Sequence, residues 1–170
     1  LGSGLPERIP GIELSEGILA LAAQEGWPVF LLGGREGVAE QAKAALLSRF
    51  SGLRIVGTHH GYFGAGPEEE ALITKIEACR PKVLLAALGV PRQEKWLAAR
   101  LAVLKIPVAI GVGGSFDVWA GVEKRAPEWM RRMHLEWFYR LLRQPARIKR
   151  MLALPRFMAQ VFLAKVSRGR

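Results

Sequence analysis

The sequence has very little aspartate, cysteine or tyrosine: one Asp, one Cys and two Tyr among 170 residues. With Cys79 alone the chain can form neither an intrachain disulfide nor a CxxC metal or redox motif, which is typical of a reducing compartment. A lone Asp117 excludes an Asp-x-Asp metal site. No apolar run is long enough to span a bilayer. We therefore expect a cytoplasmic protein with no metal site and no cofactor.

The excess positive charge of the chain is concentrated at its C-terminal end. Residues 124–170 contain 13 Lys/Arg against two Glu, whereas residues 1–123 contain 12 against 13 acidic residues. Such a cluster attracts phosphate groups on nucleotides, nucleic acids, lipid head groups or diphosphate-linked substrates. The sequence therefore predicts a neutral body, residues 1–123, followed by a basic appendage, residues 124–170.

Short apolar segments alternate with helical patterns along the body, as in a parallel sheet covered by helices on both faces. The expected strands are 27–32, 53–57, 83–88 and 108–112, and the expected helices are 14–24, 37–50, 67–79 and 91–104. The predicted fold class is α/β: a Rossmann-like, mostly parallel sheet flanked by helices, with a basic C-terminal helical appendage. Ligands bind beyond the carboxyl ends of the strands in such sheets.

Each of the four loops that follow the expected strands contains glycine, which lets the backbone turn sharply and approach a ligand closely. In the first loop, Gly33-Gly34-Arg35 lies between a strand and a helix, where backbone N–H groups can point at an anion. The loop lacks the GxGxxG fingerprint of dinucleotide sites, and a plain tight turn is an equally good interpretation. The other loops are 58–66, 89–94 and 113–121.

Polar side chains in two of these loops are candidate ligand contacts. Gln93 and Glu94 are expected in the first turn of a helix, where they can bind a sugar or a uracil edge. Helix capping with Trp96 in the core is an equally good interpretation. Asp117 could act as a base, accept a hydrogen bond from a sugar hydroxyl, or serve only in a turn.

Two adjacent histidines, His59 and His60, lie in the second loop. Adjacent side chains face in different directions, and no third ligand is evident, so we do not expect a zinc site. Either imidazole could line the site beside Tyr62.

The appendage is expected to form two helices, which begin at Pro127 and Pro145. An apolar stripe runs along the first helix: Met130, Met133, Trp137 and Leu141. Four arginines would share one sector: Arg140, Arg143, Arg147 and Arg150. Solvated charge is the simplest interpretation, but arginines among bulky apolar side chains also suit a guanidinium clamp for a diphosphate or a membrane-surface helix. The apolar faces could equally pack on a second copy of the chain, which leaves a homo-oligomer open.

Several segments together resemble the WecG/TagA/CpsF glycosyltransferases, glycosyltransferase family 26. They are ERIPGIEL, FLLGG, IVGTHHGYF, LGVPRQEKW and the long block 111–150. The resemblance implies transfer of an N-acetylmannosamine-type sugar from a UDP-sugar donor to an undecaprenyl-diphosphate-linked acceptor. It places this reaction at the cytoplasmic face of the membrane, in the synthesis of teichoic acid, capsule or related polymers. The expected reaction is inverting and metal-independent.

The resemblance also implies roles for individual residues. Arg8 and Gln93 correspond to pocket residues, and the glycine pairs Gly33-Gly34 and Gly113-Gly114 would shape the UDP pocket. The catalytic arginines implied are Arg140, Arg147 and Arg150, on an appendage thought to fold over the active site and to dock on the membrane.

One feature of the family has no counterpart here. The family's proposed base is an aspartate in an Asp-Gly motif upstream of the segment that contains Glu7, and the chain starts only six residues before Glu7. We therefore expect an N-terminally truncated sequence, with Asp117 as the secondary candidate for the base.

Two other classes of function stay open. One is a non-catalytic module whose basic tail binds phosphate, nucleic acid or a membrane surface. The other is a nucleotide-dependent oxidoreductase, which the missing dinucleotide fingerprint disfavours. The transferase interpretation predicts no nucleic-acid partner.

Overall fold

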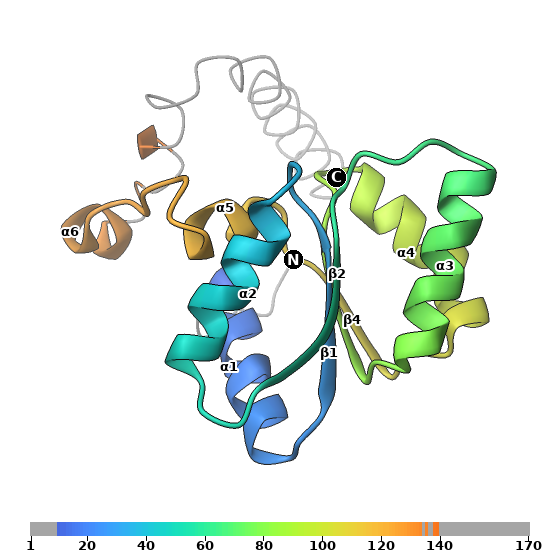
Figure 1. Cartoon of the computed structure of the whole chain (residues 1–170). Coiled ribbons are helices and arrows are strands. Elements are labelled where there is room, and N and C mark those ends of the chain that lie inside the picture. Colours follow the sequence, from blue (N-terminus) through green and yellow to red (C-terminus); the bar gives the residue numbers. More distant parts are fainter. Residues whose placement is uncertain (1–9, 134, 136–137, 140–170) are drawn as a thin grey trace, which may run out of the picture. The chain divides into compact units, whose positions relative to one another are not determined.

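A four-stranded parallel sheet forms the core of the first part of the chain (Figure 1). The computed structural model describes residues 10–133, 135 and 138–139. The strands are β1 (Pro28–Gly33), β2 (Arg54–His59), β3 (Val83–Ala87) and β4 (Val108–Gly111), in the order β2-β1-β3-β4. The predicted α/β class with a parallel sheet flanked by helices is confirmed.

Two helices cover each face of the sheet (Figure 1). On one face lie α1 (Gly11–Gln24) and α2 (Val38–Arg49), and on the other lie α3 (Pro67–Cys79) and α4 (Arg92–Leu104). The α3 helix has the predicted bounds. Its start was recognisable because Pro67 and three glutamates, residues 68–70, lie in its first turn. Acidic side chains in a first turn interact favourably with the helix dipole.

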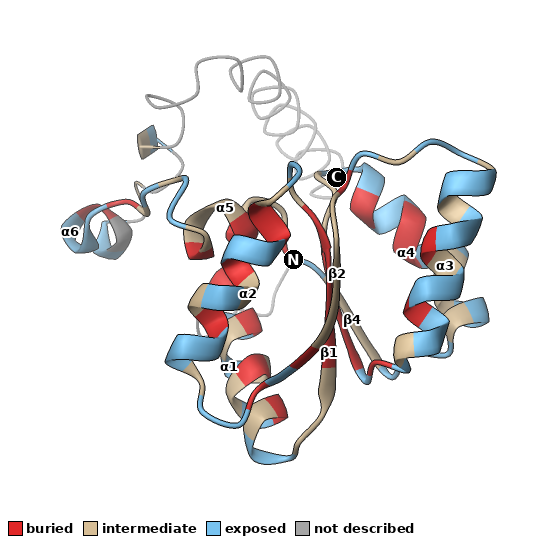
Figure 2. Cartoon of the chain, viewed as in Figure 1, coloured by how far each residue is buried: buried red, intermediate tan, exposed pale blue. Residues whose placement is uncertain are grey.

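Successive side chains of the central strands alternate between two separate cores. Figure 2 shows buried residues along these strands and on the helices on both sides of the sheet. In β1, Val29 and Leu31 join the core beneath α1 and α2, whereas Phe30 and Leu32 join the core beneath α3 and α4. All four side chains are fully buried. This burial on both faces explains why the strands are almost continuously apolar.

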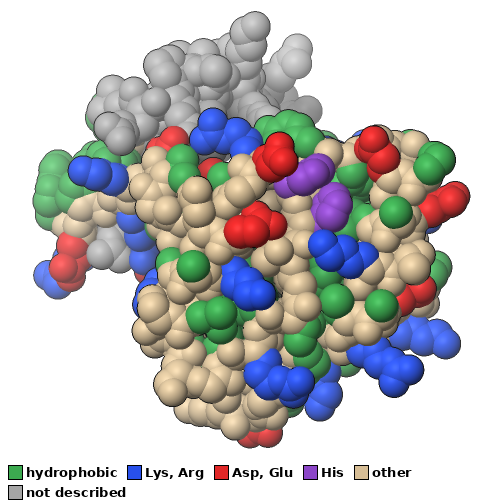
Figure 3. Space-filling view, viewed as in Figure 1, with side chains coloured by type: hydrophobic (Ala, Val, Ile, Leu, Met, Phe, Trp, Pro, Cys, Tyr) green, Lys and Arg blue, Asp and Glu red, His purple; other side chains and the backbone are tan. Residues whose placement is uncertain are grey.

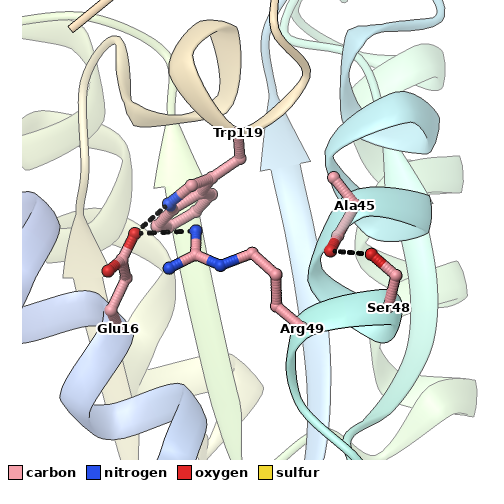
Figure 4. Close-up of polar contacts among 5 residues, drawn as sticks. All are labelled: Glu16, Ala45, Ser48, Arg49 and Trp119. Carbon is pink, nitrogen blue, oxygen red and sulfur yellow. Dashed lines mark hydrogen bonds and ion pairs between the residues drawn. The ribbon is translucent and has the colours of Figure 1, made fainter.

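A short helix, α5 (Ser115–Trp119), occupies the segment 113–121, which the sequence analysis treated as a loop. Phe116 and Trp119 are buried on it. A helix of five residues is too short to show a clear period in the sequence. The indole Nε1 of Trp119 donates to Oε1 of Glu16 in α1 at 2.9 Å, and Arg49 of α2 donates to the same oxygen at 3.1 Å (Figure 4). These contacts attach α5 to α1 and α2.

The chain divides into two compact units, Leu1–Lys124 and Arg125–Arg170. In the second unit α6 (Glu128–Arg132) follows Pro127 and is shorter than the predicted helix. The Leu135 N–H bonds to the Met130 carbonyl, five residues back, so the regular helical pattern is interrupted there. Trp137, Leu141 and the helix expected from Pro145 lie outside the described residues.

Candidate functional site

The strand order places a topological switch point between β1 and β3. The chain passes from β1 to β2 on one side and then to β3 on the other side of β1. Ligands of open α/β sheets bind at such a point, beyond the carboxyl ends of the strands. This edge lies at the top of the sheet in Figure 1, where all four glycine-containing loops emerge.

The glycine pair at the end of β1 allows two backbones to touch at the switch point. A Cβ on Gly33 would overlap the backbone of Ala87 in β3, and Gly34 has a positive φ of 75°. The Gly34 N–H donates to the Ala87 carbonyl at 3.1 Å. Since this N–H already has an acceptor within the chain, Gly34 contributes close packing at this edge rather than a free donor for an anion.

The loop after β2 folds back onto the glycine pair. The Gly61 N–H donates to the Gly34 carbonyl at 2.8 Å, and the Tyr62 N–H donates to Nδ1 of His60 at 3.2 Å. These bonds leave the Tyr62 side chain 69% exposed at the edge of the sheet. The role of Tyr62 as a ligand contact stays a prediction.

His59 is the last residue of β2 and not part of a loop as predicted, whereas His60 begins the loop that follows. Nδ1 of His59 lies 2.7 Å from the His60 carbonyl. Figure 3 shows histidine side chains on the face in view, next to acidic and basic side chains. Among residues 10–133, 135 and 138–139, no three His, Cys, Asp or Glu side chains are grouped so that they could hold a metal ion.

Arg92, in the first turn of α4, is a residue that the sequence analysis did not single out. Its guanidinium donates to the Gly61 carbonyl at 2.8 Å and to the Phe63 carbonyl at 3.0 Å. It also lies over the Phe63 ring, 4.8 Å from the ring centre. A cation is unfavourable at a helix N-terminus. The position of Arg92 at the start of a predicted helix was therefore the one feature of the sequence that pointed to a specific partner for its side chain.

Gln93 connects the same turn of α4 to the loop after β4. Its side chain is buried; Oε1 accepts from the Gly113 N–H at 3.1 Å, and Nε2 donates to Glu94 at 2.9 Å. A Cβ on Gly111 would overlap the Gln93 amide, so a larger residue there would displace this side chain. The predicted first-turn positions of Gln93 and Glu94 are confirmed, and the amide is already bonded at both ends within the chain.

The remaining predicted site residues are distributed unevenly. Gly114 directly precedes α5, and Asp117 lies half-buried in the first turn of that helix, where its backbone carbonyl accepts from the Glu123 N–H at 2.9 Å. Both carboxylates among the predicted site residues lie in the first turn of a helix at this edge: Asp117 in α5 and Glu94 in α4. Four arginines lie outside the described residues: Arg8, Arg140, Arg147 and Arg150.

The outer side of α4 is held by a carboxylate on α3. Oε1 of Glu69 accepts from Nε1 of Trp96 at 2.8 Å and from Nε of Arg100 at 2.9 Å. The Arg100 guanidinium lowers the pKa of Glu69 below its ordinary value, and Glu69 in turn raises the pKa of Arg100. Trp96 is buried, as predicted. This network anchors the helix whose first turn holds two of the site loops.

Comparison with known proteins gives consistent matches. The sequence model of the glycosyl transferase WecG/TagA/CpsF family matches residues 1–170. An N-acetylglucosaminyldiphosphoundecaprenol N-acetyl-beta-D-mannosaminyltransferase of Staphylococcus aureus (strain MRSA252) is 38% identical over 161 residues. Proteins with the same name from strains MW2 and NCTC 8325 match equally well. The match covers 95% of this chain and 62% of each relative, so the chain spans less than two thirds of their length.

None of the helices in the described part of the chain combines the length and the apolar character that a membrane crossing requires.

Proposed function

The chain belongs to the WecG/TagA/CpsF glycosyl transferase family, and from this we propose that it transfers an N-acetylmannosamine-type sugar from a UDP-sugar. The proposed acceptor is a sugar linked to undecaprenyl diphosphate, as in the names of the Staphylococcus aureus relatives. The product would enter a bacterial cell-surface polymer. The observation that carries the proposal is the family match along the whole chain, together with loops gathered at the switch point of an α/β sheet.

The arrangement of the loops supports a site for a nucleotide-linked sugar. Gly33 and Gly34 allow the end of β1 to lie close to the backbone of β3, and the side chain of Tyr62 is exposed in the neighbouring loop. Glu94, exposed and bonded to the Gln93 amide, offers a carboxylate to sugar hydroxyls. Sugar ligands need such a mixture of exposed aromatic surface and fixed polar groups.

The proposed chemistry is inverting transfer by direct displacement. A carboxylate removes the proton from the acceptor hydroxyl, the oxygen attacks the anomeric carbon, and UDP leaves from the opposite face. Asp117 is the candidate base within this chain, and the family resemblance favours an aspartate upstream of Glu7. Mutation of Asp117 tests which of these two candidates acts as the base.

Charge that develops on the leaving diphosphate requires a stabilising partner. We assign this role to Arg140, Arg147 and Arg150, with Arg8 in the donor pocket, on the strength of the family motif. The single aspartate of the sequence leaves no Asp-x-Asp motif for a metal ion, which supports metal-independent transfer. The basic residues of 124–170 would also hold the protein at the inner face of the cell membrane, where the acceptor lies.

Nucleotide binding is the direct test of the proposal. UDP should stabilise the chain against thermal unfolding, by about 2.7 kcal/mol at a concentration one hundred times its Kd. NADH should give no shift, since the dinucleotide fingerprint is absent from the loop after β1. Calorimetric titration with UDP, NADH and duplex DNA measures the three affinities side by side.

A functional assay then separates the transferase from a binding module. Transfer of the sugar from UDP-N-acetylmannosamine to the lipid-linked acceptor should proceed in the presence of a chelator. Binding of duplex DNA without any response to UDP would contradict the proposal and favour a phosphate-binding module, because the cluster of 13 Lys/Arg in residues 124–170 would then serve nucleic acid.

A further inference from the structure

We propose that Arg92 is a positioning residue for donor binding: it holds the loop after β2, with Tyr62 at its tip, in the orientation that receives the nucleotide. The inference rests on the proposed function and adds to it a residue that acts through its neighbours. The carrying observation is that one guanidinium bonds two carbonyls of this loop, those of Gly61 and Phe63, on either side of Tyr62.

The geometry of the contact fits a clamp. A guanidinium is planar and presents its N–H donors as a rigid fork, so two carbonyls bound at 2.8 and 3.0 Å fix the direction of the peptide segment between them. The Phe63 ring lies against the cation and packs edge-on against Trp96 of the same helix. The loop is thereby attached to α4 through both its backbone and a side chain.

The clamp extends to the glycine pair at the switch point. The Gly61 N–H bonds to the Gly34 carbonyl, and the Gly34 N–H bonds to Ala87 in β3. Arg92 therefore binds the carbonyl of Gly61 while the end of β1 binds its N–H. If the fork is lost, the Gly61 bond to Gly34 and the Tyr62 bond to His60 remain, but the backbone of the loop loses its two bonds to α4.

Two functions of Arg92 make different predictions. A cation that simply attracts the diphosphate can be replaced by lysine, which keeps the charge. A fork that binds two carbonyls cannot, because a lysine ammonium has no planar pair of donors. For a positioning residue we therefore expect Arg92→Lys to bind UDP nearly as weakly as Arg92→Ala.

The experiment compares UDP affinity and thermal stability in the full chain. Arg92→Ala and Arg92→Lys should each weaken UDP binding by about tenfold, because charged hydrogen bonds contribute on this scale. The matched control is Arg54→Ala at the opposite, amino end of the strands, which loses a hydrogen bond to the Gly26 carbonyl at 3.2 Å. This control should lower the melting temperature and leave the UDP affinity unchanged.

A double-mutant cycle with Tyr62→Ala tests whether Arg92 acts through the loop. Tyr62 is exposed, so its replacement should leave the fold intact. If Arg92 positions Tyr62, the double variant should bind UDP about as weakly as Tyr62→Ala alone. Strictly additive losses, or full rescue by Arg92→Lys, would show a direct charge effect and overturn the inference.

Hydrogen exchange provides a readout that does not depend on UDP. The Gly61 amide donates to Gly34 and the Tyr62 amide donates to His60, and both should exchange faster in Arg92→Ala than in the unmodified chain. Unchanged exchange at these amides would overturn this inference but leave the proposed function in place. An unmodified chain that fails to bind UDP would instead overturn the proposed function, and with it the nucleotide role of the clamp.

Discussion

At the scale of single residues, the side chains of Arg92 and Gln93 bind backbone groups of the loops at the candidate site. Arg92 and Gln93 are neighbours in sequence, yet one bonds the loop after β2 and the other bonds the loop after β4. Neighbouring positions on a helix point about 100° apart, so one turn can reach two loops. The first turn of α4 thus organises two of the four loops at the carboxyl edge.

Gln93→Glu is expected to destabilise the chain at neutral pH by about 1–3 kcal/mol, because a carboxylate replaces the amide that donates to Glu94. Two carboxylates would then face each other, and their repulsion raises the pKa of one of them. The loss should therefore shrink as the pH falls and one carboxyl is protonated. Urea unfolding at neutral and mildly acidic pH measures this change.

The control for this prediction is Gln41→Glu, an exposed position on α2 with the same chemical change. It should leave the free energy of unfolding nearly constant at both pH values. An equal effect at Gln41 and Gln93 would mean that the Gln93 amide bonds do not contribute to stability.

The sequence predicted the elements of the body because each carries a local signal. Apolar strands such as 83–88 and a proline-led, acidic helix start at Pro67 can be recognised from a few adjacent residues. The α5 helix could not, since its position depends on the contact of Trp119 with Glu16, which lies 103 residues earlier. The Arg92 clamp was missed for the same reason: its partners are backbone carbonyls about 30 residues away, which no side-chain pattern reveals.

At the scale of elements, Glu16 connects three helices through one carboxylate oxygen (Figure 4). Glu16→Ala should lower the free energy of unfolding by about 1–3 kcal/mol, since the buried Trp119 loses the acceptor of its indole N–H. Glu16→Gln should lose less, because its amide oxygen still accepts. Urea unfolding followed by circular dichroism measures both variants, with the exposed Glu25→Ala as control. Equal stability of Glu16→Ala and the control would contradict the bridging role.

The Glu69 network on the other face predicts a pH dependence. Arg100 and the desolvated indole of Trp96 bind the ionised carboxylate, which lowers the pKa of Glu69 from its ordinary value of 4.5. A lowered pKa in the folded state contributes stability above the unfolded pKa, and this contribution is lost as the pH falls through the folded pKa. Glu69→Gln should therefore have a lower melting temperature than the unmodified chain at neutral pH.

The difference between these two proteins should decrease below about pH 4.5, where the unmodified Glu69 begins to lose its advantage. Thermal unfolding from neutral to acidic pH measures both curves. Parallel curves across the whole range would show that Glu69 does not titrate differently in the folded and unfolded chain.

At the scale of the whole molecule, charge is separated along the sequence. The body is nearly neutral, while residues 124–170 carry 13 Lys/Arg against two Glu. Under the proposed function the acceptor stays in the membrane, and basic residues would bring the proposed donor site to an anionic surface. The unit boundary after Lys124 coincides with this change of charge.

This separation predicts salt-sensitive binding to anionic lipid vesicles. Each basic residue near such a surface contributes about 1 kcal/mol, so replacing Arg140, Arg147 and Arg150 with glutamine should weaken vesicle binding by roughly a hundredfold. The matched control replaces the exposed body residues Arg54, Arg80 and Lys105 with glutamine, for the same change in net charge. Co-sedimentation with vesicles that contain acidic lipid, at low and high salt, measures both variants. If the two triple variants bind equally weakly, net charge alone governs the attraction, and the basic segment has no special role in reaching the membrane.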